Sequence, residues 1–493
     1  MSLTTTRRTL LRSLAGLGAA GAALTLARPR RAAAAWGDAP PAFAGSMLPP
    51  DRQVRRVLEL TMYGGLNPFD TFHCVPTWGE HDGTYLHAFD VASRVAACGG
   101  PSALTRPFAD GPHELIHLGP WTWPLWSRPD ILARTRVVVM RHDQLPHETA
   151  IPLTLTGHRV GRPELAGAGA AVQRHFGERP ETARTVPHAA VIQPGDLVRV
   201  DNYRAALAVG LHPAAARPLE VDLAAFQSLE HLLQRPATAD RRAAHDAFQA
   251  EARARLAARL GPRTPPAWTA YTAAESARER SDVLASLLPP TLFGLSEATV
   301  CDLTNISKPA LAARVAAHLL THPETPLRYV QWIDAGLEQT RDGGHDSHRG
   351  HLHHASTNYP HTLANLAAII NSPDEHDPAK LDLDDSLVVI STEFGRSPAI
   401  QPTLDGLNHW PHAYVAVLIG GPIHTPSVVG QIDPTTGTAR DHATPAELRA
   451  AVSLALGVYP FDRGGLDPAS VRDAPDAGTA LRDLSTRVLG VTP

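Results

Sequence analysis

The sequence has little cysteine and little lysine. Its three cysteines, Cys74, Cys98 and Cys301, lie far apart among 493 residues, so they provide neither a full disulfide framework nor a thiolate zinc site. One disulfide remains available if the protein is exported. The formal net charge is −4 and there is no long charge run. This lack of a basic surplus predicts that the protein has no nucleic-acid partner.

Long apolar runs are also missing. Beyond the first 35 residues, no segment is apolar over enough residues to span a bilayer, which predicts no integral membrane segment in the mature protein. The N-terminus carries Arg7 and Arg8, a short Gly/Ala-rich apolar run over 14–27, and alanines at 32–35 that offer cleavage sites. We interpret residues 1–35 as a twin-arginine signal peptide, rather than a membrane anchor or a basic arm, because the run is short. The predicted location is therefore the periplasm or the extracellular medium.

The remaining chain divides by composition. Residues 36–52 are rich in Pro and Gly and are predicted to form a linker, and residues 53–493 are predicted to form one large domain. From about 197 to 320, Ala, Arg, Glu and Leu recur at helical spacing, which predicts a mainly helical insertion or a covering layer of helices. The sequence does not determine the oligomeric state.

Short apolar segments, mostly β-branched, are typical of strands buried on both faces of a sheet. They cover residues 54–63, 136–140, 327–333, 387–390 and 414–419. Strands of this kind are typical of open α/β sheets.

Polar residues accompany these strands at the ends where open α/β sheets bind ligands. Asp70, with Asn67 nearby, follows the first strand; Glu393 and Arg396 follow the 387–390 strand; His409 precedes the last strand. Glu and His brought to one edge by consecutive strands would assemble a metal site. The alternative is ordinary turn residues, an Arg–Glu pair closing a strand end, and a surface histidine.

Histidine is abundant, with 26 residues, and it is clustered. Residues 342–354 contain five histidines and two aspartates directly after a predicted strand. Such a tract is a weak surface metal binder or proton buffer in some proteins, but its position here favours a metal site. Asp346 and His348 are the leading ligand candidates. Imidazole and carboxylate together suit zinc, manganese or iron, whereas a carboxylate-rich set favours magnesium or calcium.

Three tryptophans, Trp121, Trp123 and Trp126, lie close together in a Gly/Pro-rich region. They would either line a substrate cleft or form a small apolar core for their own loop, and the second arrangement is the more common.

Four short motifs occur in a characteristic order: Gly64-Gly65 with Asp70-Thr71, Asp346-Ser347-His348, Glu393-Phe394-Gly395-Arg396, and His409-Trp410-Pro411. Their order and spacing resemble a bacterial family of twin-arginine-exported proteins of unknown function (domain of unknown function 1501). That family is assigned to the alkaline phosphatase and sulfatase superfamily. The resemblance spans roughly residues 55–460 without the helical middle.

The resemblance implies an alkaline phosphatase-like α/β/α sandwich with a mostly parallel sheet. It also implies one or two divalent metal ions (zinc, manganese, calcium or magnesium) held by Asp70, Asp346, His348, Glu393 and His409. Bound metals would polarise a phosphate or sulfate ester, and Arg396, with Arg141 as a further candidate, would neutralise the anion. Asn67 would contact the substrate.

The sequence departs from the superfamily pattern in two ways. Alignment on Thr156-Gly157 places His147 where sulfatases carry their nucleophile, and the nearest hydroxyl belongs to Thr149. His147 would act as nucleophile, metal ligand or general base. One histidine ligand is also replaced by Phe394, so a second metal is either absent or held by His147, His345 or His351.

Two functions are consistent with these residues. The first is an exported metal-dependent hydrolase acting on a phosphate or sulfate ester of a small molecule or polymer. The second is a binding protein of the cell envelope that retains the fold and the metal but has lost the nucleophile.

Overall fold

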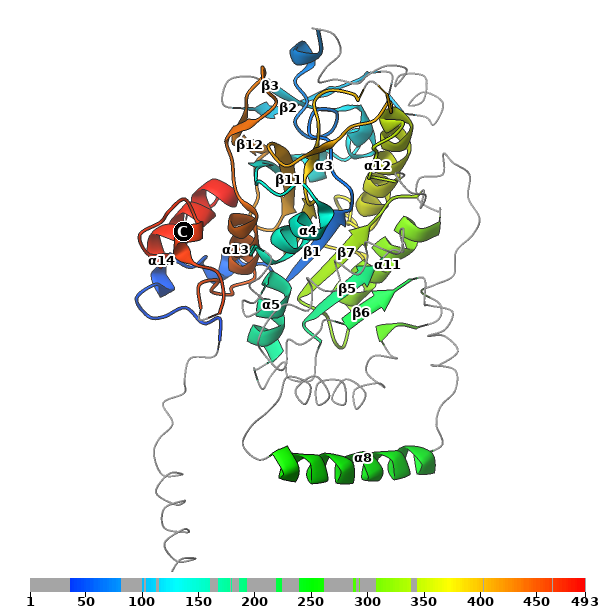
Figure 1. The fold of residues 1–493 in the computed structure, drawn as a ribbon, viewed down its shortest axis with the longest axis vertical. Coiled ribbons are helices and arrows are strands. Elements are labelled where there is room, and N and C mark those ends of the chain that lie inside the picture. The colour runs from blue at the N-terminus through cyan, green and yellow to red at the C-terminus, as the bar shows by residue number, and fades with distance from the viewer. Residues whose placement is uncertain are drawn as a thin grey trace, which may run out of the picture. The chain divides into compact units, whose positions relative to one another are not determined.

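The protein is described by a computed structural model, drawn in Figure 1. The described residues are 36–80, 100–101, 103–111, 115–159, 167–177, 179, 186–192, 219–223, 239–260, 287–289, 292, 307–337, 344–401, 403–462 and 464–492. The predicted signal peptide (1–35), Cys98, Cys301 and much of the predicted insertion lie outside them. Cys74 is a buried free thiol.

A large central sheet runs through the described part of residues 37–493 (Figure 1). Its strand order is β12 (Ser427–Val429), β4 (Thr135–Met140), β11 (Tyr414–Gly420), β8 (Ser386–Ser391), β1 (Arg56–Met62), β7 (Tyr329–Asp334), β5 (His188–Ile192) and β6 (Leu219–Asp222). Within this sheet β11 runs antiparallel to both of its neighbours, and the other described pairings are parallel. The predicted α/β class with a mostly parallel sheet is confirmed.

The five predicted strands correspond to β1, β4, β7, β8 and β11. The antiparallel direction of β11 decides where its flanking residues lie. The start of β11, after His409, lies at the edge where β8 ends, whereas Gly420 and Gly421 lie at the opposite edge. Because β4 is antiparallel to β11, its carboxyl end also lies at the edge that carries His409. The strand directions thus bring the ends of β1, β4, β7 and β8 to one side.

One face of the sheet packs against α11 (Ser307–Thr321) and α12 (His351–Ala368). Alternate strand residues such as Leu58, Leu60 and Trp332 point into this core, as the two-residue period of a strand requires. The tryptophan segment joins this core from η4 (Pro120–Leu125), with Trp121 and Trp126 buried and Trp123 packed against it. The tryptophans therefore serve packing.

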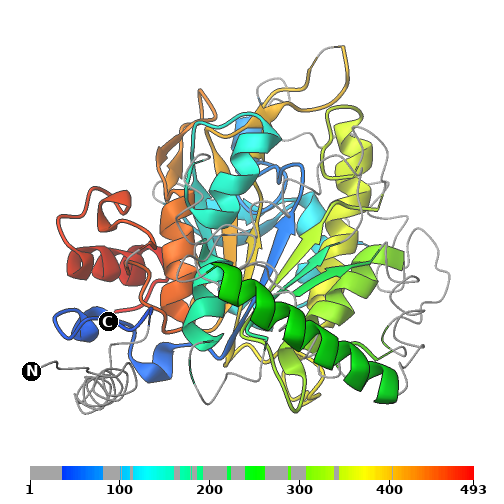
Figure 2. The ribbon, with the colours of Figure 1, turned by 60° about the horizontal axis from the view of Figure 1, so that its bottom comes forward.

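The other face carries α4 (His147–Thr156), α5 (Ala168–Gly177) and α13 (Pro445–Ala455). In Figure 2, α13 in orange and α12 in yellow lie on opposite sides of the strands. This face holds a buried ion pair: Arg449 of α13 donates to both carboxylate oxygens of Glu59 on β1, and both side chains are fully buried. Tyr329 and Ser391 also donate to Glu59. The carboxylate is thus satisfied within the core.

Further elements complete the described chain. The remaining helices are α3 (Pro129–Ala133), α8 (Ala239–Leu260) and α14 (Ala477–Asp483), with a π-helical turn η8 (Leu484–Val488) and 3-10 turns η1 (Ala44–Ser46), η2 (Pro50–Arg52), η3 (Pro76–Glu80) and η7 (Pro468–Ser470). Three small antiparallel ribbons pair β2 (Arg106–Asp110) with β3 (Leu115–Leu118), β9 (Gly395–Arg396) with β10 (His409–Trp410), and β13 (Gln431–Ile432) with β14 (Ala439–Asp441). Among the helices described, none has both the length and the apolar character needed to cross a membrane.

Candidate metal centre

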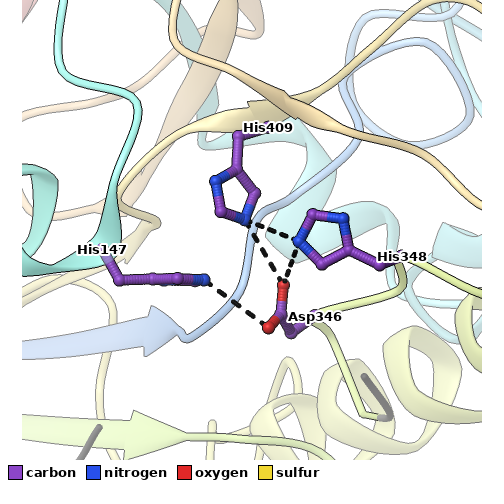
Figure 3. A group of neighbouring side chains, drawn as sticks. All are labelled: His147, Asp346, His348 and His409. Carbon is purple, nitrogen blue, oxygen red and sulfur yellow. Dashed lines mark hydrogen bonds and ion pairs between the residues drawn. The ribbon is translucent and has the colours of Figure 1, made fainter. Parts of the chain in front are cut away.

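Four side chains converge at the edge of the sheet where β4, β7 and β8 end (Figure 3). His147 comes from the first turn of α4, just after β4. Asp346 and His348 come from the loop between β7 and α12, and His409 comes from β10, just before β11. Each of the four offers a ligand atom, and these atoms all lie within 4.8 Å of one another. Residues separated by more than 250 positions in the chain are thus brought together.

The individual distances match a small coordination sphere. Asp346 Oδ2 lies 3.5 Å from His147 Nε2, and Asp346 Oδ1 lies 3.3 Å from His348 Nε2 and 3.6 Å from His409 Nε2. In a tetrahedral site with bonds of about 2.0 Å, neighbouring ligand atoms are about 3.3 Å apart. The 2.8 Å between the Nε2 atoms of His348 and His409 is shorter. The donor set therefore fits one ion after a small adjustment of these two rings.

The outer ring nitrogens of two histidines are held by protein acceptors. His409 Nδ1 donates to the carbonyl of Leu145 at 2.9 Å, and His147 Nδ1 donates to Glu393 Oε1, also at 2.9 Å. Each bond directs the ring's Nε2 atom toward Asp346. Histidines that bind metals commonly carry such a partner on their second nitrogen, so the surroundings also suit a metal site.

The charge states of the group are set by burial and by Arg396. Burial is the largest influence on Asp346 and works to raise its pKa, but the charge of Arg396 together with hydrogen bonds from His147 and His409 outweighs burial and holds this pKa well below its usual range. Burial, followed by the charge of Arg396, lowers the pKa of His348 to about 3. Burial also lowers the pKa of His409. At neutral pH the carboxylate is therefore ionised and these two imidazoles are neutral, the states in which they bind a cation.

His147 differs from the other two histidines. Burial lowers its pKa, but hydrogen bonds to Asp346 and then Glu393 outweigh burial, and the net direction is upward. A cation at the centre would compete with the proton on Nε2 for the same lone pair.

Arg396 is fully buried and contacts protein groups. It donates to Asp346 Oδ1 at 2.5 Å, to the Leu407 carbonyl at 3.0 Å and to the Gly64 carbonyl. Its position close to the β1 loop depends on glycine, because a Cβ on Gly65 would lie 2.8 Å from Arg396 Nε. Arg396 thus contacts Asp346 from the buried side and orients its carboxylate.

Glu393 lies behind His147 rather than among the four donors. Its Oε1 accepts from His147 and also from the backbone N–H of Gly64 at 2.7 Å. Gly64 has φ +108°, and a Cβ there would lie 2.4 Å from the Asp346 nitrogen. Both the carboxylate and the glycine therefore fix the spacing between the β1 loop and the ligands.

The remaining predicted ligands form a neighbouring buried cluster. Asp70 Oδ2 accepts from His351 Nε2 at 2.8 Å, and Asn67 Nδ2 lies 3.5 Å from the same nitrogen. His345 Nε2 lies 3.3 Å from Asp334 Oδ2. Within the described residues, Asp70 Oδ1 has no hydrogen-bond partner. These residues thus bond to one another and do not belong to the group of four donors.

Two predicted residues make other contacts. Thr149 Oγ1 donates to the Pro146 carbonyl at 3.2 Å, and Arg141 Nη1 donates to the Ala439 carbonyl at 3.0 Å. Sequence reasoning missed Asp334, although its position at the end of β7 is the same signal that identified Glu393 after β8. It also missed the carbonyl of Leu145, because every residue has a backbone carbonyl and the sequence does not show which of them accepts a hydrogen bond.

The fold and the four donors define the class: an α/β protein with a mostly parallel central sheet and a candidate metal site at one edge. The chain belongs to the family described as "Protein of unknown function (DUF1501)", whose model matches residues 54–461. This confirms the family resemblance seen in the motifs.

Comparison with solved structures shows a distant similarity. A crystal structure described as a protein in the alkaline phosphatase superfamily, from Vibrio parahaemolyticus, is 11% identical, with 86% of this chain and 72% of that chain covered and a TM-score of 0.35. None of the curated proteins compared with this chain matches it.

Proposed function

We propose that the protein is a metal-dependent hydrolase of phosphate or sulfate esters that is exported by the twin-arginine pathway. The observation that supports this proposal is the convergence of His147, Asp346, His348 and His409 within 4.8 Å. Three imidazoles and one carboxylate favour zinc, with manganese as a second candidate, over the oxygen-rich sites of calcium and magnesium.

Each residue then has a defined task. His147, His348, His409 and Asp346 would hold the ion. A fifth coordination position, which zinc accepts, would let the ion supply Lewis-acid polarisation of the ester oxygens and an acidified water. Glu393 and the Leu145 carbonyl orient two of the imidazoles. Arg396 keeps Asp346 ionised and in place. Substrate would approach past His348 and His409, whose side chains are 22% and 14% exposed, because Asp346 and His147 are more deeply buried.

The metal-loaded protein is expected to hydrolyse at least one of p-nitrophenyl phosphate, bis-p-nitrophenyl phosphate and p-nitrophenyl sulfate. A chelator or the substitution His147→Ala should abolish the release of nitrophenol, because either removes the centre. His424→Ala is the matched control: His424 is exposed and follows β11 at the opposite edge, so turnover should be unchanged.

A binding function is the second candidate. None of the four donors is a hydroxyl or a thiol, so the group itself contains no serine, threonine or cysteine nucleophile. Protein that holds about one metal ion but turns over no phosphate monoester, diester or sulfate would contradict the hydrolase proposal and favour metal-dependent binding at the cell envelope.

Export depends in this proposal on Arg7 and Arg8. Because the twin-arginine translocase reads this pair, Arg7→Lys together with Arg8→Lys should retain the precursor in the cytoplasm of a bacterial host. Cell fractionation and N-terminal sequencing of the mature chain measure this result. Unchanged appearance of mature protein outside the cytoplasm would show that another signal directs export.

A further inference from the structure

The ligand loop, residues 344–350, carries two of the proposed metal ligands with one hydroxyl between them. Asp346 and His348 face the centre, and Ser347 Oγ lies 2.7 Å from His351 Nδ1 in the first turn of α12. His351 Nε2 lies 2.8 Å from Asp70 Oδ2 in the loop after β1. A hydrogen-bonded chain therefore links the ligand loop to the β1 loop.

The direction of each bond follows from its chemistry. A carboxylate accepts hydrogen bonds, so His351 Nε2 carries a proton and donates to Asp70. The other ring nitrogen, Nδ1, accordingly accepts from the Ser347 hydroxyl. Both ring nitrogens of His351 are thus engaged, and the imidazole is fixed in one tautomer and one orientation.

A serine, a histidine and an aspartate in this order also occur in hydrolase triads. Burial argues against a nucleophilic role here. Ser347 is 1% exposed, while His351 and Asp70 are 0% exposed. A hydroxyl enclosed in this way has no room for an ester, whereas it does hold the backbone that presents Asp346 and His348.

The loop is anchored at its other end by a similar pair. His345 Nε2 lies 3.3 Å from Asp334 Oδ2 at the end of β7, and the Thr362 hydroxyl also donates to this carboxylate. The His345 ring stacks on Tyr359 with 5.3 Å between ring centroids. Histidine–carboxylate pairs therefore flank the two ligands on both sides.

We propose that Ser347 is a positioning residue that, through His351 and Asp70, holds Asp346 and His348 in the geometry that binds the metal. This inference rests on the metal centre of the proposed function. The histidine-rich tract then has two uses: His348 binds the ion, whereas His345 and His351 fix the loop. A loop held in this way loses little conformational freedom when the ion binds.

The test measures zinc affinity by competition with a chromophoric chelator, and the visible absorption spectrum with cobalt in place of zinc. Ser347→Ala should weaken zinc binding about 10- to 100-fold, the usual effect of losing an outer partner of a metal ligand, and should change the cobalt spectrum. Ser347→Thr retains the hydroxyl and should bind zinc within about threefold of the original protein, since its bond to His351 is kept.

Ser485→Ala is the matched control for loss of a buried hydroxyl. Ser485 is fully buried and donates to the Leu481 carbonyl at 2.8 Å in the C-terminal helical segment. It should lower thermal stability without changing zinc affinity or the cobalt spectrum. Asp70→Asn is a milder change at the other end of the hydrogen-bonded chain, and it provides a second variant if Ser347→Ala does not fold. It should weaken zinc binding several-fold.

The outcomes separate the two proposals. If the original protein binds zinc but Ser347→Ala, or Asp70→Asn in its place, binds it equally well, the positioning role is wrong while the metal centre stands. Equal weakening by Ser485→Ala would also overturn the positioning role, since the effect would be one of general stability. If the original protein binds neither zinc nor cobalt, the metal centre itself is wrong.

Discussion

Replacing Asp346 with asparagine is expected to remove the metal ion from the purified protein. Asp346 is the one carboxylate among the four donors, and both of its oxygens lie within 3.6 Å of a ligand imidazole. Losing an outer partner of a metal ligand lowers metal affinity roughly 10- to 100-fold, and losing the ligand Asp346 itself should lower it more. We therefore expect zinc affinity to fall by at least about 100-fold, measured by elemental analysis after dialysis and by chelator competition.

Asp385→Asn is the control for this experiment. Asp385 also pairs with an arginine, with 2.8 Å to Arg56 Nη2, but it lies at the amino end of β1, at the opposite edge of the sheet. The same chemical change there should leave the metal content unchanged. Full zinc occupancy and unchanged affinity in Asp346→Asn would contradict the centre proposed here.

The second large effect concerns stability. Replacing Arg449 with methionine leaves the carboxylate of Glu59 fully buried without its cation. Burial raises the pKa of Glu59, and at present the charge and hydrogen bonds of Arg449 outweigh this and lower it. Breaking a buried pair by removing one partner typically costs about 3–5 kcal/mol. We expect the free energy of unfolding, measured with urea, to fall by about this amount.

A double variant separates loss of the pair from loss of packing. Glu59→Gln combined with Arg449→Met removes both charges. Tyr329 and Ser391 donate to different oxygens of Glu59, so the Gln side-chain oxygen keeps one of these bonds and its amide nitrogen donates to the other hydroxyl. The double variant should recover most of the lost stability, because replacing both charged partners is often close to neutral. If the double variant were less stable than Arg449→Met, then the methionine packing and not the unpaired charge would be the cause.

Much of the fold could be predicted because each strand is specified locally. The β-branched runs at 136–140 and 387–390 are apolar throughout and became β4 and β8, buried on both faces. By contrast, β5 and β6 are short and lie next to or within a region that was interpreted as helical, so their place in the sheet was missed. Their pairing is a long-range choice that no local period encodes.

The candidate site could be predicted in part. Asp346, His348 and His409 were expected to lie together because each is next to a strand end, and the structure brings all three into the group of four donors. The roles of His345 and His351 were not separable by sequence, because each is one more imidazole in the same tract. His345 pairs with Asp334 and His351 pairs with Asp70. These pairings depend on which strand ends lie next to each other in the sheet.

The sequence by itself determined the α/β class, the family and a candidate metal-binding set of residue types at the ends of buried strands, since periodicity and residue chemistry are local properties. Only the tertiary structure decided which residues face one another. The antiparallel direction of β11 carries His409 to the site, and the close approach at Gly64 and Gly65 brings the β1 loop against Asp346 and Arg396. Such juxtapositions arise from packing between segments hundreds of residues apart, so they exist only after the chain has folded.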